Sequence, residues 1–122
     1  FERLESLLSS KNCFRIVAQP VDNVQTSSHY CMGMILGPAL AVNRATIIDL
    51  LKARGIGTSI YYPHPVPHMT YYKEKYGKIA CPNAKTISNS IIALPIGPHI
   101  DLIDIETIAS EVLSVFEKVK IK

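Results

Sequence analysis

The chain has 122 residues, of which 48% are hydrophobic and 19% are charged, a composition that fits one folded domain and excludes a disordered segment. Its 13 basic and 10 acidic residues give a formal net charge of +3, and because the lysines form no dense run, we expect no nucleic-acid partner. No apolar stretch reaches the ~20 residues of a membrane-spanning helix, and no signal peptide is visible, so we expect a cytoplasmic protein without a membrane partner.

The first half of the chain is predicted to begin with a helix and to continue through strands. Apolar residues recur at helical spacing over 1–8, which indicates a short amphipathic helix. Asn43 can cap a second helix that ends at Gly55, because glycine adopts the left-handed conformation common at helix ends. A polar loop over 22–28 separates the first two strands. The strands predicted in this half are 14–18, 29–36 and 56–61.

The second half is predicted to contain a proline-rich loop, then helices on either side of one strand. Pro63, Pro65 and Pro67 should hold the loop extended and exposed, because proline cannot donate to a sheet ladder. Asp101 and Asp104 form a capping box at the start of the last helix. A helical turn, a modest helix and a buried strand are predicted over 71–76, 82–87 and 91–94. The last helix has one apolar face, made of Ile105, Ile108, Ala109, Val112, Leu113 and Phe116.

This order of elements predicts an α/β (α+β) fold in which a small mixed or antiparallel sheet is covered by helices on one side. Residues 1–122 should form a single domain, because a chain of this length supports one hydrophobic core.

The densest group of functional side chains lies in the segment 61–72, which holds two histidines, four tyrosines and three prolines. Side chains on a stiff loop lose little entropy on binding, which favours ligand contact. A structural loop with half-buried tyrosines and solvated imidazoles explains the same pattern equally well.

We expect no metal site and no catalytic residue in this chain. His64 and His68 are four apart, but Pro65 and Pro67 prevent the helix that would place both on one face, and Cys81 could join them only if the loop closed. The three cysteines are too widely spaced for a disulfide framework and are expected to be reduced thiols that fill the core. No lysine has an apolar pocket suited to a Schiff base.

Three blocks of the sequence resemble the DegT/StrS-type nucleotide-sugar aminotransferases. They are RGIGTSIYYPHPVPHMTYYKEKYG at 54–77, CPNAK at 81–85 and IALPIGP at 92–98, in the order and spacing of that family. The resemblance extends from about Phe1 to Val119.

The resemblance implies the C-terminal small domain of a pyridoxal-phosphate-dependent enzyme whose large, cofactor-binding domain is absent here. The parent would transfer an amino group, usually from glutamate, to a nucleotide-linked keto sugar for amino-sugar or surface-polysaccharide synthesis. It would work as a homodimer. The fragment alone, without the Schiff-base lysine, is expected to bind no cofactor and to be inactive. Because the contacts to the missing domain are lost, Phe1, Leu4 and Leu8 should be exposed, and the chain should self-associate.

The resemblance also assigns substrate-binding residues. Tyr62 matches a family tyrosine and Tyr61 stands where many members have histidine, while His68 lies one position after the family's loop histidine and His64 occupies a variable position. Strand alternation should point the two tyrosine rings to opposite sides, one toward substrate and one into the domain. Packing at the strand end is the alternative explanation for this pair. A non-catalytic module that uses the same loop to bind a sugar or peptide is the alternative for the whole chain.

Overall fold

The computed structural model describes residues 1–9, 11–17 and 27–120, and most of the predicted polar loop over 22–28 lies outside them. Three strands and six α-helices are found in this part of the chain, together with one 3-10 turn, η1. In chain order they are α1 Glu2–Leu8, β1 Phe14–Ile16, β2 Met32–Leu36, α2 Pro38–Ala41, α3 Arg44–Ala53, η1 Val66–His68, α4 Thr70–Tyr76, α5 Pro82–Ser90, β3 Ile91–Leu94 and α6 Leu102–Lys120.

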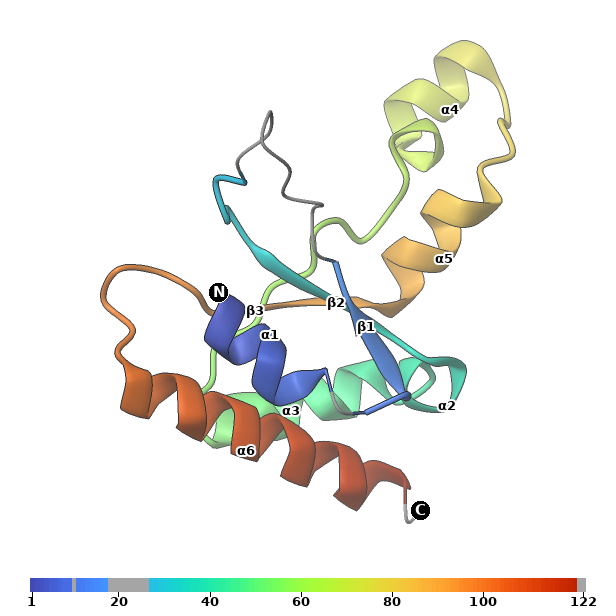
Figure 1. Ribbon diagram of the computed structural model, residues 1–122. Coiled ribbons are helices and arrows are strands. Elements are labelled where there is room, and N and C mark those ends of the chain that lie inside the picture. Colours follow the sequence, from blue (N-terminus) through green and yellow to red (C-terminus); the bar gives the residue numbers. More distant parts are fainter. Residues whose placement is uncertain (10, 18–26, 121–122) are drawn as a thin grey trace.

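The sheet is antiparallel and has the order β1-β2-β3, with Phe14 opposite Leu36 and Met32 opposite Leu94. Figure 1 shows α1, α3 and α6 together on one side of it. The predicted fold class, a small sheet covered by helices on one side, is confirmed. All four residues of β3 are buried, as expected for the predicted strand over 91–94.

The core lies between the sheet and this helical layer. Along α6 the apolar spacing places Val112 and Phe116 at full burial, and the Phe116 ring meets Phe14 of β1 edge-on at 5.3 Å between centroids. Leu4 and Leu8 of α1 are also buried in this core. The prediction that they are exposed is therefore wrong, because α1 packs on α6 of the same domain. Self-association of the chain stays a prediction.

Two helix ends follow the sequence closely. Asp104 N donates to Asp101 Oδ1 at 2.9 Å and Asp101 N donates to Asp104 Oδ2 at 3.2 Å, which is the predicted capping box of α6. Asn43 precedes α3 but makes no side-chain capping bond. Gly55 ends this region in the left-handed conformation, with φ of +80°.

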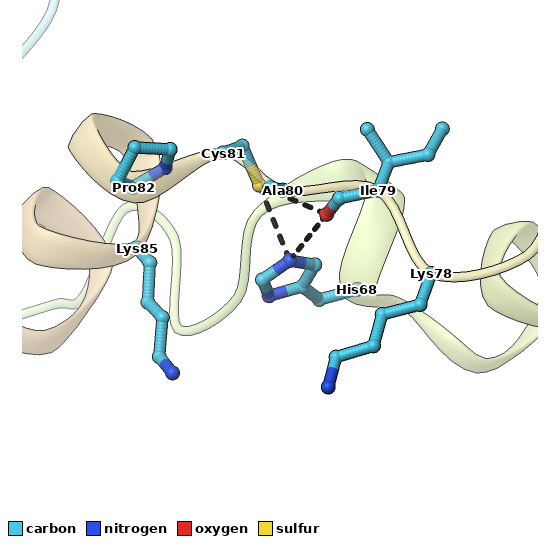
Figure 2. Close-up of a pocket in the computed structure, with 7 residues that line it drawn as sticks. All are labelled: His68, Lys78, Ile79, Ala80, Cys81, Pro82 and Lys85. Carbon is cyan, nitrogen blue, oxygen red and sulfur yellow. Dashed lines mark hydrogen bonds between the residues drawn. The ribbon is translucent and has the colours of Figure 1, made fainter.

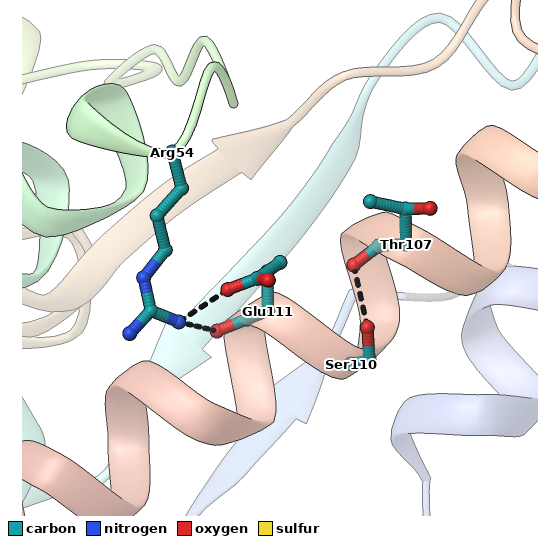
Figure 3. Close-up of polar contacts among 4 residues, drawn as sticks. All are labelled: Arg54, Thr107, Ser110 and Glu111. Atoms are coloured by element: carbon teal, nitrogen blue, oxygen red, sulfur yellow. Dashed lines mark hydrogen bonds and ion pairs between the residues drawn. The ribbon is translucent and has the colours of Figure 1, made fainter.

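Arg54 links the end of α3 to the middle of α6. Its guanidinium Nη1 contacts the carboxylate of Glu111 and lies 3.4 Å from the carbonyl oxygen of the same residue (Figure 3). Ser110, the residue before Glu111 on α6, donates from Oγ to the Thr107 carbonyl at 2.9 Å. The ion pair is partly shielded from solvent, because the two side chains are 28% and 37% exposed.

Two predicted elements in the middle of the chain are wrong. Residues 56–61 form a single bridge, Ser59 with Ala93, in place of a strand, because the chain leaves β3 after that pair. The proline series is not extended throughout, since Val66–His68 form η1 and Pro65 is buried. Proline's fixed φ suits the first turn of a helix as well as an extended loop. The short α2, which begins at Pro38, was not predicted.

Residues 66–87, here named the arm, project from the rest of the molecule (Figure 1). They comprise η1, α4 and most of α5, and every residue of 69–80 and 82–87 is exposed. The predicted helical turn over 71–76 is present as α4, and the predicted helix over 82–87 is longer, reaching Ser90. None of the helices in the described ranges has the length and apolar character needed to cross a bilayer.

Candidate functional site

Three tyrosine rings gather where the chain leaves the sheet. The rings of Tyr61 and Tyr62 lie 5.4 Å apart, and Tyr30, which precedes β2, lies 6.4 Å from Tyr61. Tyr61 is 37% exposed and Tyr62 is 65% exposed. The prediction that the two rings point to opposite sides is wrong, because these residues do not form a regular strand and the alternation rule does not apply to them.

A pocket of about 300 Å³ adjoins two of these rings, those of Tyr30 and Tyr61. Tyr30, Ser59, Tyr61 and His99 contribute to its lining, together with the end of β3. Flat aromatic faces and polar groups of this kind suit a ligand that has both apolar ring faces and hydroxyl groups, such as a sugar. The Ser59–Ala93 bridge holds one wall, with backbone bonds of 3.1 Å and 2.7 Å.

His68 lies at a second pocket, of about 410 Å³, on the arm (Figure 2). Its Nε2 is 3.1 Å from the carbonyl oxygen of Ile79 and 3.2 Å from Cys81 Sγ. Lys78 and Lys85 also border this pocket. Loop closure therefore does bring Cys81 to His68, although no group of three potential metal ligands exists among the described residues.

The four candidate residues thus do not form one site. Tyr61 and Tyr62 meet beside the first pocket, His68 borders the second, and His64 is exposed and lines neither. Sequence reasoning missed Tyr30, Ser59 and His99, because only the pairing of β2 with β3 brings the flanking segments together. The prediction that the Cys81 side chain fills the core is wrong, since Cys81 borders a surface pocket.

The described residues do not fit a site for pyridoxal phosphate by themselves. A lysine that forms a Schiff base is normally desolvated or set beside another cation in a protected pocket. Lys78 and Lys85 border a pocket, yet their side chains are exposed. The other described lysine side chains are exposed as well: Lys11, Lys52, Lys73, Lys75 and Lys118.

Comparison with known proteins gives one consistent result. The model of the DegT/DnrJ/EryC1/StrS aminotransferase family matches residues 1–113. Among solved structures, PseC of Helicobacter pylori, an aminotransferase involved in the biosynthesis of pseudoaminic acid, is similar over 96% of this chain and 31% of its own, with a TM-score of 0.84 and 20% identity.

The aminotransferase TlmJ of Streptoalloteichus hindustanus is similar over 97% of this chain and 30% of its own, with a TM-score of 0.82 and 24% identity. DesV of S. venezuelae, solved in complex with a ketimine intermediate, is similar over 93% of this chain and 29% of its own, with a TM-score of 0.74 and 21% identity. At these identities the structures show a shared fold. This chain spans less than a third of the length of each.

Proposed function

This chain belongs to the DegT/DnrJ/EryC1/StrS aminotransferase family, and from that membership we propose that it is the C-terminal small domain of a larger sugar aminotransferase. The parent transfers an amino group from glutamate to the keto group of a nucleotide-linked sugar, in amino-sugar or surface-polysaccharide synthesis. It acts in the cytoplasm as a homodimer. Its large domain carries pyridoxal phosphate, which serves as an electron sink in amino transfer.

The observation that carries this proposal is the exposed Tyr61–Tyr62 pair beside a pocket at the edge of the sheet. Tyrosine offers a flat apolar face for a sugar ring and a hydroxyl for a hydrogen bond. Both rings are accessible, so both can contact substrate. In this proposal the small domain forms one wall of the substrate site and leaves the chemistry to the large domain.

His64 and His68 complete the proposed substrate-binding set. His64 is exposed and free to reach a ligand held at the domain boundary. His68 is held by its bonds to Ile79 and Cys81, which fixes the direction of its ring. We expect both histidines to contribute less than the tyrosines, since neither lines the pocket beside Tyr61.

The test uses the gene product with whatever coding sequence precedes Phe1. Tyr61→Ala and Tyr62→Ala should each lower kcat/KM toward nucleotide-linked keto sugars. The expected decrease corresponds to a loss of about 1–3 kcal/mol of transition-state binding. Tyr61→Phe should separate the ring's contribution from that of the hydroxyl. Tyr72→Ala on the arm is the matched control and should keep activity. Full activity in both alanine variants would show that the pair is structural.

The 122-residue chain alone tests the second part of the proposal. Mixed with pyridoxal phosphate, it should give no stoichiometric adduct that borohydride traps on one lysine, because the described lysines are exposed. A trapped adduct at a single lysine would contradict the division of labour between domains. Sugar binding by a gene product that begins near Phe1 would instead support the non-catalytic binding module.

A further inference from the structure

Cys81 is the one residue of 69–87 that is not exposed. It directly precedes α5, and its side chain turns toward His68, on the other side of the arm's loop (Figure 2). The Sγ to Nε2 distance is 3.2 Å. Cys13 and Cys31 are also unpaired thiols, but among the described residues only Cys81 has a hydrogen-bonding side chain at its sulfur. The local environment of the Cys81 sulfur therefore differs from that of Cys13 and Cys31.

The hydrogen bonds assign the proton on His68. Nε2 lies 3.1 Å from the Ile79 carbonyl oxygen, and a carbonyl oxygen can only accept, so Nε2 carries hydrogen. The same N–H faces the Cys81 sulfur, which then acts as the acceptor. A neutral thiol can point its own hydrogen at the Ile79 carbonyl, 3.9 Å away. When that hydrogen is lost, the His68 N–H remains as a donor to the sulfur.

Apart from Cys81 and His68, the ionisable side chains at this pocket are positive. Lys78 and Lys85 border it, and in Figure 2 their side chains extend on either side of the imidazole. The nine-residue α5 begins at Pro82, so its positive N-terminal end lies next to the sulfur. Reactive cysteines occupy electropositive, partly exposed surroundings made of these same elements: a histidine, lysines and a helix N-terminus.

We propose that Cys81 is a site of reversible thiol–disulfide exchange with small anionic disulfides of the glutathione type. The Cys81 thiol gives its proton to solvent, and Sγ attacks one sulfur of the disulfide. A new S–S bond forms as the old one breaks, so the thiol is oxidised to a mixed disulfide. The departing half is reduced and takes a proton from solvent as a free thiol. Carboxylates of the reagent pair with Lys78 and Lys85, and His68 holds the attacking sulfur.

The pocket has room for this reaction. Its volume of about 410 Å³ lies within the roughly 300–1,000 Å³ range of small-molecule sites. The arm leaves it open to solvent, so a disulfide can approach without unfolding. The pocket at Cys81 is separate from the pocket at Tyr61, and His68 is the one residue of the proposed substrate-binding set that borders it. Thiol–disulfide exchange at Cys81 can be measured without any aminotransferase assay, so the two proposals can fail independently.

The experiment follows the reduced full-length gene product in glutathione disulfide, with peptide mass mapping of Cys13, Cys31 and Cys81 over time. Cys81 should form the mixed disulfide at least about tenfold faster than Cys13 and Cys31, and dithiothreitol should reverse the reaction. Equal rates at the three cysteines would overturn the proposal. A neutral disulfide, bis(2-hydroxyethyl) disulfide, tests the ligand class, since it should show a smaller preference for Cys81.

Matched variants assign the roles. His68→Leu removes the N–H donor and should slow exchange at Cys81 by about tenfold, whereas His68→Gln, which retains an N–H donor, should recover part of the rate. The double variant Lys78→Gln/Lys85→Gln should slow glutathione disulfide by about threefold to tenfold and leave the neutral reagent unchanged. Lys52→Gln/Lys118→Gln is the charge control, with no effect expected. An unchanged rate in His68→Leu, or equal slowing of both reagents, contradicts the assigned roles.

Discussion

The body and the arm of this domain, joined through α5 and residues 56–65, are stabilised in different ways. In the body, which comprises the sheet with α1, α2, α3 and α6, apolar side chains of the strands and helices are buried against one another. In the arm, α4 has no buried residue, and its aromatic side chains contact each other at the surface, as in the stacked pair Tyr72 and Tyr76. Burial organises the body, whereas local backbone bonds and ring contacts organise the arm.

The same residue type therefore contributes differently to stability in the body and in the arm. An aromatic ring in the core of the body packs against many neighbours, so truncating it lowers the stability of the fold. A ring on the arm is available to a ligand or to another protein surface and contributes little to folding.

The largest effect is expected from removing a core ring. Phe116→Ala should lower the free energy of unfolding by about 3–5 kcal/mol, because Phe116 is 1% exposed and meets Phe14. Tyr72→Ala on the arm should change it by about 0.5 kcal/mol or less. Urea denaturation followed by circular dichroism measures both. A loss of similar size in the two variants would remove the distinction between body and arm.

Two glycines with nearly the same positive φ sharpen the comparison. Gly55 ends α3 in the body with φ of +80°, and Gly77 ends α4 in the arm with φ of +76°. No atom lies within 4 Å of a methyl group added at either, so the cost of alanine comes from the positive φ, which residues other than glycine rarely adopt. Gly55→Ala should lower the unfolding free energy by about 1–2 kcal/mol.

Gly77→Ala should lower global stability much less, because the arm can open by itself while the body stays folded. Native-state hydrogen exchange measures this directly, since the amides of α4 should exchange faster in the variant with those of β2 unchanged. Faster exchange throughout the body in the Gly77 variant, by the same factor as in α4, would show that the regions unfold together.

The capping box gives a smaller effect confined to the body. Asp101→Ala removes the acceptor of the Asp104 N–H and should lower the unfolding free energy by about 1 kcal/mol. Asp101→Asn retains a side-chain oxygen and should recover most of that loss, which thermal unfolding of the two variants can verify. If Asp101→Ala and Asp101→Asn lose the same stability, the effect comes from the charge of Asp101 near the helix end and not from its hydrogen bond.

The smallest effect concerns two of the described ion pairs, which join α6 to α1 and to the end of α3. A double-mutant cycle on Arg54 and Glu111 should give a coupling of about 0.5–1 kcal/mol, because this pair is partly shielded. The pair of Arg3 and Glu106 is more exposed, at 54% and 62%, and should show nearly none. High salt should reduce the coupling energy between Arg54 and Glu111. A larger coupling at Arg3 would indicate that burial does not decide these contributions.

Much of the body could be predicted because its signals are local. The apolar spacing of α6, the Asp101–Asp104 box and the left-handed Gly55 each depend on residues close together in the chain. The middle of the chain was predicted less well. The segment 56–61 has the composition of a strand, yet only Ser59 pairs with β3, and where a strand leaves a sheet is decided by its neighbours in space.

By itself, the sequence determined the family, the helix-covered sheet and the presence of an aromatic and histidine-rich loop, because these follow from periodicity and from motifs in a fixed order. Only the tertiary structure decided which members of that loop meet. It placed Tyr61 and Tyr62 side by side with Tyr30, separated His64 from His68, and brought Cys81 to His68 across 13 positions of the chain. The physical reason is that such contacts depend on turns and strand pairing between distant segments, whose energies no local pattern records.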